Sequence, residues 1–318
     1  MENISLVYFS NVIGSVNKTG VKEFILVAFS DIQELEMLLF IVFLMAYVLC
    51  VMGNIVILAL VSIEPSLKTP MYFFIGTLSA LEIILVSVTV PKLLANLIAA
   101  DNRISITGCF GQLYAFNALG VTECYLLAVM SFDRDLAINN PLHYMVIMSK
   151  TFYTKLAILP WVIGLVIAFF PTVFTARLEF CGPNTINHFF CDLAPLQNLA
   201  CSDPFISNVV TSTAAIFATV IPFFTIMGFY IHIIATISKI KSFGGKQKAF
   251  STCSSHLIVA SMFFGTAIIV YVRPKGSKYD KFLALMYTVF TPLLNPFIYT
   301  LRNKTVMVAL RKSRSLKD

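Results

Sequence analysis

The chain of 318 residues has few charged side chains, since Asp, Glu, Lys and Arg together make up only 12% of it. A soluble domain usually carries about 25%. Hydrophobic residues make up 58%, and the mean hydropathy is +0.84. This composition argues against an ordinary soluble domain and indicates a membrane protein. The net charge of +7 does not indicate nucleic-acid binding, because the basic residues are scattered among apolar runs.

Motifs for enzymatic or metal chemistry are also missing. The chain has no Gly-rich phosphate loop, and His143, His188, His232 and His256 lie in different segments without metal-ligand spacing. We therefore expect neither an enzyme nor a metal site. The N-terminal stretch lacks a basic run before an apolar core, so we do not expect a cleaved signal peptide.

Seven segments are long and apolar enough to cross a bilayer, which requires about 20 residues. We expect them to be helices, because each backbone polar group must be satisfied within its own segment. The predicted fold is an all-α membrane protein, a seven-helix bundle (37–301) in a single domain covering 1–318. The spans are residues 38–61, 70–90, 109–132, 156–176, 205–238, 249–272 and 282–301, and kinks are expected at Pro160, Pro171, Pro222, Pro292 and Pro296.

The distribution of Lys and Arg predicts the orientation of the spans. Fourteen of the 23 basic residues lie on the side of the C-terminus. This places the tail (302–318) in the cytoplasm and the N-terminal segment (1–36) outside. Two sequons in that segment, at Asn3 and Asn17, are glycosylation candidates.

Four cysteines lie on the expected outer side. Cys109 begins the third span, and Cys181, Cys191 and Cys201 share the loop before the fifth. In an oxidising compartment they suggest two disulfides, and the spacing leaves three pairings open. A crosslink from this loop to the third span would hold it as a lid over the mouth of the bundle.

Four motifs in this order carry a family resemblance: "PMYFFIGTLSALE" (70–82), "MSFDRDLAINNPLHY" (130–144), "KAFSTCSSHL" (248–257) and "PLLNPFIYTLRN" (292–303). The chain resembles the odorant receptors, which are rhodopsin-like G-protein-coupled receptors, over nearly its whole length. The resemblance implies a plasma-membrane receptor that detects small volatile molecules and activates a stimulatory G protein to raise cAMP. It also implies the disulfides Cys109–Cys191 and Cys181–Cys201. After the last span we expect a short amphipathic helix with Val306 and Leu310 facing inward.

The resemblance also places a ligand cavity in the outer half of the bundle. Helical spacing puts its third-span members on one face, although each single residue could equally serve helix packing. No acid lies on this part of the third span, so a cationic ligand would find no buried counter-ion. We predict a small, neutral, mainly apolar ligand with one polar group. The expected lining residues are Phe116, Asn117, Gly120, Val121, Ala214, Ala218, Phe264, Ala267, Ile268, Tyr271, Tyr287 and Thr288.

Two acids, Glu82 and Glu123, fall inside spans, where an ionisable group is a functional candidate. The resemblance places both in mid-bundle with Asn54 and Asn295. Two neighbouring carboxyl groups either share a proton or bind a cation. One hypothesis is a Na⁺ site that stabilises the inactive state, and the other is a neutral acid that only fixes helix packing.

The expected switch lies around "DRD" and "NPFIY". The resemblance implies that Arg134 pairs with Asp133 at rest and faces the G protein in the active state. A Pro kink with polar groups can have two packings, which a switch needs, although it can also be an ordinary membrane-helix kink. The expected switch residues are Asp133, Arg134, Asp135, Tyr230, Asn295, Pro296 and Tyr299.

Some residues depart from the family pattern, which reads close to "MAYDRYVAICNPLHY" at 130–144. Here Phe132 replaces the first Tyr, Asp135 the second, and Asn139 the Cys. We expect Asp135 either to hold Arg134 more tightly and weaken coupling, or to point to water, where a pair contributes only about 0–1 kcal/mol. The alternatives for the whole chain are a rhodopsin-like receptor for a non-odorant ligand and, more distantly, a transporter. A transporter would usually show inverted repeats, which are not apparent.

Overall fold

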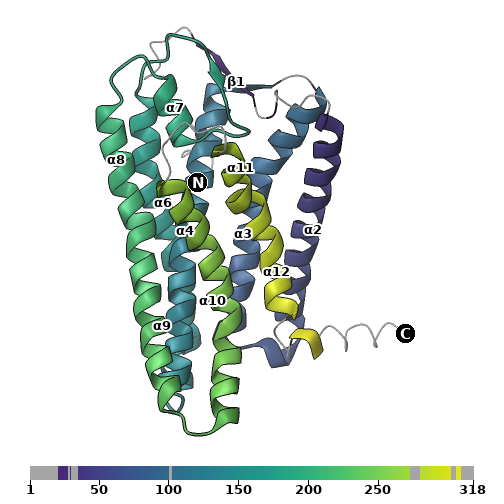
Figure 1. Ribbon diagram of the computed structural model, residues 1–318, viewed down its shortest axis with the longest axis vertical. Coiled ribbons are helices and arrows are strands. Elements are labelled where there is room, and N and C mark those ends of the chain that lie inside the picture. Colours follow the sequence, from purple (N-terminus) through teal and green to yellow (C-terminus); the bar gives the residue numbers. More distant parts are fainter. Residues whose placement is uncertain are drawn as a thin grey trace.

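The computed structural model describes residues 21–27, 29, 35–99, 102–272, 280–301 and 306–308, and within its helices the side chains of 243, 245, 248–252, 268–272, 280, 282 and 299–301 are not described. Figure 1 shows long helices running side by side, with a loop and a small sheet across one end. The first four long helices are α2 (Glu36–Ile63), α3 (Pro70–Ala99), α4 (Ile106–Asn139) and α6 (Lys150–Ala176).

Two of the remaining three spans, the fifth and the seventh, are built from shorter pieces. The fifth consists of α8 (Phe205–Ala215), the π-helical η3 (Ile216–Val220) and α9 (Ile221–Lys239). The sixth is α10 (Phe243–Val272). The seventh consists of α11 (Asp280–Leu285), the π-helical η4 (Met286–Phe290) and α12 (Thr291–Leu301). Short connecting elements are η2 (Pro65–Leu67), α5 (Tyr144–Ile147) and α7 (Leu193–Leu199).

Five of the described helical segments are long and apolar enough to cross a membrane: 36–63, 70–99, 106–139, 150–176 and 205–239. The described stretches Cys253–Ala267 and Leu283–Ile298 are shorter apolar helices in the sixth and seventh spans. Large hydrophobic side chains such as Met45, Met52 and Phe224 are more than half exposed. A surface of this kind is stable against lipid rather than water. The arrangement is the predicted seven-helix bundle.

The two π-helical turns lie where prolines interrupt the fifth and seventh spans. Pro222 and Pro292 each follow a π turn by two residues. A proline lacks the N–H that would bond to the carbonyl four residues earlier, and its ring clashes with that carbonyl. For Pro222 that carbonyl belongs to Ala218, and for Pro292 it belongs to Thr288. Both carbonyls lie inside a π turn, and the wider turn accommodates the proline ring. By contrast, α6 continues past Pro160 and Pro171.

A three-stranded sheet, which was not predicted, crosses one end of the bundle. Its strands are β1 (Glu23–Leu26), β2 (Arg103–Ser105) and β3 (Thr185–Ile186), in the order β2-β1-β3. Strand β1 pairs antiparallel with β2 and parallel with β3. Phe24 and Leu26 of β1 are fully buried in a cluster with Cys109 and Leu196. The sheet therefore ties the segment before α2 to the loop after α6; we call this the lid end.

Helix α4 is the centre of the bundle. In the apolar stretch of α4, 67% of the residues are buried, against 22% in the apolar stretch of the fifth span. Its closest neighbour is α6, where a Cβ atom on Gly164 would overlap the Thr122 hydroxyl and the Ala118 carbonyl oxygen. The Thr122 hydroxyl donates to that same carbonyl at 2.7 Å. Only glycine lets the two helices approach so closely, as small residues do in other membrane bundles.

Candidate functional site

The lid is the segment between α6 and α8, and it is crosslinked at two points. The disulfides are Cys109–Cys191 and Cys181–Cys201, with Cα–Cα distances of 5.5 and 6.0 Å. These are the two pairings that the resemblance implied. Gln112 adds a second attachment, because its Oε1 accepts the backbone N–H of Cys191 at 3.0 Å. Its amide nitrogen donates to the carbonyl of Val88 on α3 at 2.9 Å, so one side chain joins α3, α4 and the lid.

Aromatic side chains carry the lid down into the bundle. Phe189 and Phe190 are buried, and the ring of Phe190 lies 4.6 Å from that of Phe116 on α4. Phe116 in turn lies 6.0 Å from Tyr287 in η4. His188 stacks on Phe189 at 4.8 Å. The structure thus brings together two predicted ligand-lining residues, Phe116 and Tyr287, under Phe190 of the lid. Phe190 was not predicted to line the cavity.

The other predicted lining residues differ in their burial and in their contacts. Phe264 is buried and packs on Phe223 at 5.6 Å. Asn117 donates one of its two amide N–H groups to Leu113, and the Thr288 hydroxyl donates to Ala284, in each case one turn back along the same span. A Cβ atom on Gly120 would meet nothing within 4 Å, so α4 borders open space there. Val121 is buried, Ala214, Ala218 and Ala267 are partly buried, and the side chains of Ile268 and Tyr271 lie outside those described.

The two acids within the spans are fully enclosed, each at most 1% exposed. Asn295 of α12 donates a hydrogen bond to Glu82 Oε1. Glu82 and Glu123 lie close enough to interact electrostatically. Glu82 Oε2, Glu123 Oε1 and Asn295 Oδ1 are buried acceptors without a hydrogen-bond partner in the described part of the chain. An unpartnered buried acceptor is costly, so this cluster is suited to a proton, a water or a hard cation.

The predicted joint at "NPFIY" lies beside this cluster. A Cβ atom on Gly53 of α2 would lie 3.2 Å from Pro296 Cβ, so the proline ring packs directly on the α2 backbone. Asn54, next to Gly53, donates to the Cys50 carbonyl of its own helix at 3.0 Å. Asn295 and Pro296 therefore face α2 and α3. The side chain of Tyr299 lies outside those described.

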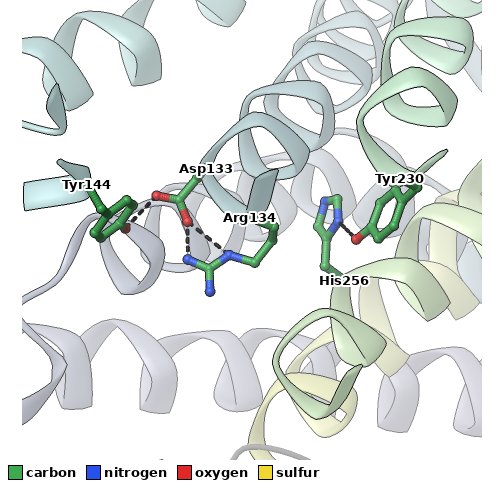
Figure 2. Close-up of polar contacts among 5 residues, drawn as sticks. All are labelled: Asp133, Arg134, Tyr144, Tyr230 and His256. Carbon is green, nitrogen blue, oxygen red and sulfur yellow. Dashed lines mark hydrogen bonds and ion pairs between the residues drawn. The ribbon is translucent and has the colours of Figure 1, made fainter. Parts of the chain in front are cut away.

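At the opposite end of α4, which we call the Arg134 end, Asp133 and Arg134 form an ion pair. Figure 2 shows Arg134 donating from Nε, at 3.0 Å, and from Nη2 to the same carboxylate oxygen of Asp133. The Tyr144 hydroxyl of α5 donates to the other oxygen at 2.7 Å. Burial, together with the negative charge of Asp133, raises the pKa of Tyr144 well above its usual value. Tyr144 therefore remains a neutral donor, and Asp133 is bonded through both oxygens.

A second contact at this end joins α9 to α10. The Tyr230 hydroxyl and His256 Nδ1 are 2.5 Å apart, and the two rings are nearly parallel at 12° (Figure 2). A small cavity, with room for about one water, lies between His256 and the ion pair. Its lining residues are Met71, Phe74, Met130, Asp133, Arg134 and His256.

Asp135 occupies neither of the positions expected from the sequence. Its side chain is 13% exposed, so it does not point to open water. It also does not restrain Arg134, whose ion pair is with Asp133. Instead, Asp135 Oδ1 lies 2.8 Å from His232 Nδ1 on α9 and accepts from Asn139 Nδ2 at 2.6 Å. The preference of a carboxylate for donors explains this placement, because His232 and Asn139 each offer a donor to Asp135, while Arg134 Nε and Nη2 are bonded to Asp133.

Comparison with known proteins decides the family. The olfactory receptor family model matches residues 43–316. The chain belongs to the olfactory receptor family. Human olfactory receptor 10C1 is 46% identical over 302 residues, covering 94% of this chain and 97% of that protein. Mouse olfactory receptor 6E1 is 45% identical over 307 residues, covering 93% and 96%.

The fold is shared more widely than the family. The crystal structure of squid rhodopsin matches with a TM-score of 0.72 at 16% identity, covering 88% of this chain and 80% of that one. The protein is thus a membrane receptor of rhodopsin-like fold and not an enzyme. Small ligands and a G protein are the partners of this receptor class.

Sequence reasoning missed three side chains of the site. Tyr144 belongs to the motif "PLHY", and its position after the third span was the available signal. Gln112 lies one turn after Cys109 on α4, which places it below the predicted crosslink. His232 carried no signal, because its contact with Asp135 joins residues 97 positions apart. Asn3 and Asn17, the predicted glycosylation sites, lie outside the described residues.

Proposed function

We propose that this olfactory receptor detects small neutral volatile molecules and raises cAMP through a stimulatory G protein. The observation that carries the proposal is the placement of two sites on one helix. Phe116 lies under the lid near one end of α4, and Arg134 is held in an ion pair near the other. A rigid central helix of this kind can couple a ligand to a partner at its far end.

The orientation follows from the chemistry of the two ends. Disulfides form in oxidising compartments, so the lid end with its two disulfides faces the outside of the plasma membrane. The Arg134 end, with exposed Lys150, Lys155 and Lys239, faces the cytoplasm, in keeping with the positive-inside rule. The N-terminus then lies outside and the C-terminus inside.

Ligand chemistry is constrained by the groups near the lid. Phe116, Phe190 and Tyr287 present aromatic surface, and Gly120 borders open space one turn below Phe116. The Thr288 hydroxyl and one N–H of the Asn117 amide donate within their own spans, which leaves the rest of the Asn117 amide for a polar group of the ligand. A mainly apolar ligand with one polar group suits such a lining, because extra polar groups would lose water without gaining partners.

The contacts of the Arg134 end suit a resting receptor. Arg134 is 6% exposed, so a partner at this end cannot reach it while Asp133 holds it. The Tyr230–His256 contact ties α9 to α10 beside it. In the proposed mechanism, ligand binding near Phe116 favours a packing in which these contacts open and Arg134 becomes available to the G protein.

A cAMP reporter screen against chemically diverse volatiles tests this function, with surface receptor measured in parallel. We expect activation by neutral compounds, and loss of the response in Gly120→Leu without loss of surface receptor. Gly228→Leu on α9, where a Cβ atom also meets nothing within 4 Å, is the matched control. Strong selective activation by a primary amine, or full responses in Gly120→Leu, would contradict the proposed ligand site.

We also propose that the central cluster holds Na⁺ in the resting state. Support comes from its unpartnered oxygens, Glu82 Oε2, Glu123 Oε1 and Asn295 Oδ1, since Na⁺ is a hard cation that prefers oxygen ligands. The competing reading is a neutral acid that only fixes helix packing. Replacing Na⁺ by choline should raise agonist potency in the wild type and leave Glu123→Gln unchanged. Equal potency in both salts for the wild type would exclude the ion.

A further inference from the structure

Two residues of α4 that depart from the family pattern meet the same side chain of α9. Asp135 Oδ1 lies 2.8 Å from His232 Nδ1, and Asn139 Nδ2 lies 3.0 Å from the same nitrogen. Asn139 also donates to Asp135 at 2.6 Å, and its Oδ1 accepts from the hydroxyl of Thr236. The two departures are therefore parts of one network, together with His232 and Thr236.

The donor and acceptor roles in this network are determined by its geometry. A carboxylate only accepts hydrogen bonds, so His232 Nδ1 must carry a hydrogen to lie 2.8 Å from Asp135 Oδ1. Asn139 must present its NH₂ group to Asp135, because the reverse orientation would place two acceptors together. Its oxygen is then free to accept from Thr236, as observed. With these roles, Asn139 and His232 both donate to Asp135 Oδ1, and the 3.0 Å between Asn139 Nδ2 and His232 Nδ1 is a contact between two donors that share one acceptor.

The network spans two helices that run in the same direction. Asp135 and Asn139 are one turn apart on α4, and His232 and Thr236 are one turn apart on α9. The contacts Asp135–His232 and Asn139–Thr236 both join residues 97 positions apart, so they form two parallel rungs. The His232 side chain is 61% exposed, whereas Asp135 is only 13% exposed. Two rungs resist both sliding and rotation of α9 against α4.

The consequence reaches Arg134 through α9. His232 follows Tyr230 by two residues, and Tyr230 bonds to His256 of α10 beside the buried Arg134. We propose that Asp135, Asn139, His232 and Thr236 form a polar clasp that positions α9 against α4 and thereby favours the state in which Arg134 is buried. Asp135 is a positioning residue in this clasp and not a second partner of Arg134. The effect on signalling rests on the proposed G-protein coupling.

Nucleotide exchange on a G protein, measured in membranes and normalised to receptor number, tests the clasp. Asp135→Ala and His232→Ala should each raise ligand-independent exchange about fivefold, which corresponds to one or two side-chain hydrogen bonds. The double variant should exceed neither single variant by much, because both remove the same contact. Asp135→Tyr, which restores the usual family residue, should behave like Asp135→Ala. Additive effects, or lower exchange in the single variants, would overturn the proposal.

Ser238→Ala is the matched control, because this exposed hydroxyl of α9 bonds only to the Ala235 carbonyl in the contacts described for it. It should leave ligand-independent exchange unchanged. Amide hydrogen exchange on the purified full-length receptor provides a readout that needs no G protein. The segment 232–239 should exchange faster in Asp135→Ala and His232→Ala than in the wild type or Ser238→Ala.

The two measurements separate two failures. A wild type that drives no nucleotide exchange with any G protein contradicts the proposed function, while amide exchange still decides on the clasp. Equal amide exchange in all four proteins contradicts the clasp, whatever the signalling result.

Discussion

The two ends of the bundle are held together by different kinds of contact. At the lid end, two disulfides, a three-stranded sheet and the Gln112 side chain connect the loops to the helices. At the Arg134 end, the described polar contacts are side-chain hydrogen bonds and ion pairs, centred on Asp133, Tyr230 and Asp135, and they lie among packed apolar side chains. One end is crosslinked and the other is not.

This difference suits a receptor that binds at one end and signals at the other. A disulfide typically contributes about 2–4 kcal/mol, and it exchanges partners only when a free thiolate attacks it. A side-chain hydrogen bond contributes about 0.5–1.5 kcal/mol net and can be replaced by another. The lid end can therefore keep its shape while the Arg134 end changes between two packings of similar free energy.

Removing a crosslink from the lid end should have the largest effect on stability. The Cys109–Cys191 disulfide closes a separation of 82 residues, and Cys181–Cys201 one of 20. By loop-closure entropy the first contributes about 4 kcal/mol and the second about 3 kcal/mol. The double variant Cys109→Ser/Cys191→Ser should therefore unfold at a lower temperature than Cys181→Ser/Cys201→Ser. Thermal unfolding of the purified receptors measures this order, and the reverse order would show that the lid is held mainly by its second crosslink.

Gly164→Ala should lower the stability of both ends together, because α4 connects them. The new methyl group would overlap Thr122 and the Ala118 carbonyl and push α6 away from α4. Overpacking of this kind costs about 1–3 kcal/mol. Gly228→Ala, where the added Cβ atom meets nothing within 4 Å, is the control for helix propensity alone. If both variants have the same unfolding temperature, the close approach of α4 and α6 is not limiting.

Tyr144→Phe should have the smallest effect, and it should be confined to the Arg134 end. The variant removes one hydrogen bond to Asp133, worth about 1 kcal/mol. Ligand-independent signalling per surface receptor should rise a few-fold, and the unfolding temperature should fall by less than in Gly164→Ala. Because the pKa of Tyr144 is raised, its hydroxyl is protonated at pH 6 and at pH 8, so the effect should be the same at both. Tyr153→Phe, in a ring that packs on Phe73 at 5.0 Å, is the control. A pH-dependent difference would show that Tyr144 titrates in this range.

Much of the fold was predictable, because it depends on composition and length along single segments. The apolar runs predicted the spans to within a few residues at most ends, although α3 and α4 extend further than expected, to Ala99 and Asn139. The small sheet at the lid end was not predicted. Its strands are only two to four residues long, and they pair across more than 70 residues of chain.

The candidate site was predictable where one helix carries both partners. Asp133 and Arg134 are adjacent, and their ion pair was expected and is present. Asp135 is also adjacent to Arg134, and there the expectation was wrong. The carboxylate of Asp135 accepts hydrogen bonds from His232 on α9 and from Asn139 on α4, whereas Arg134 Nε and Nη2 are bonded to Asp133.

By itself, the sequence determined the membrane class, the number and approximate bounds of the spans, and the presence of an ion pair at the end of the third. These follow from hydropathy, from the length of a bilayer-spanning helix and from neighbours in the chain. The choice among the three disulfide pairings that cysteine spacing left open, the contact of Phe190 with Phe116, and the clasp from Asp135 to His232 were decided by the tertiary structure. Each depends on how helices are rotated and shifted against one another, and that is set by packing across the whole bundle, as at Gly164.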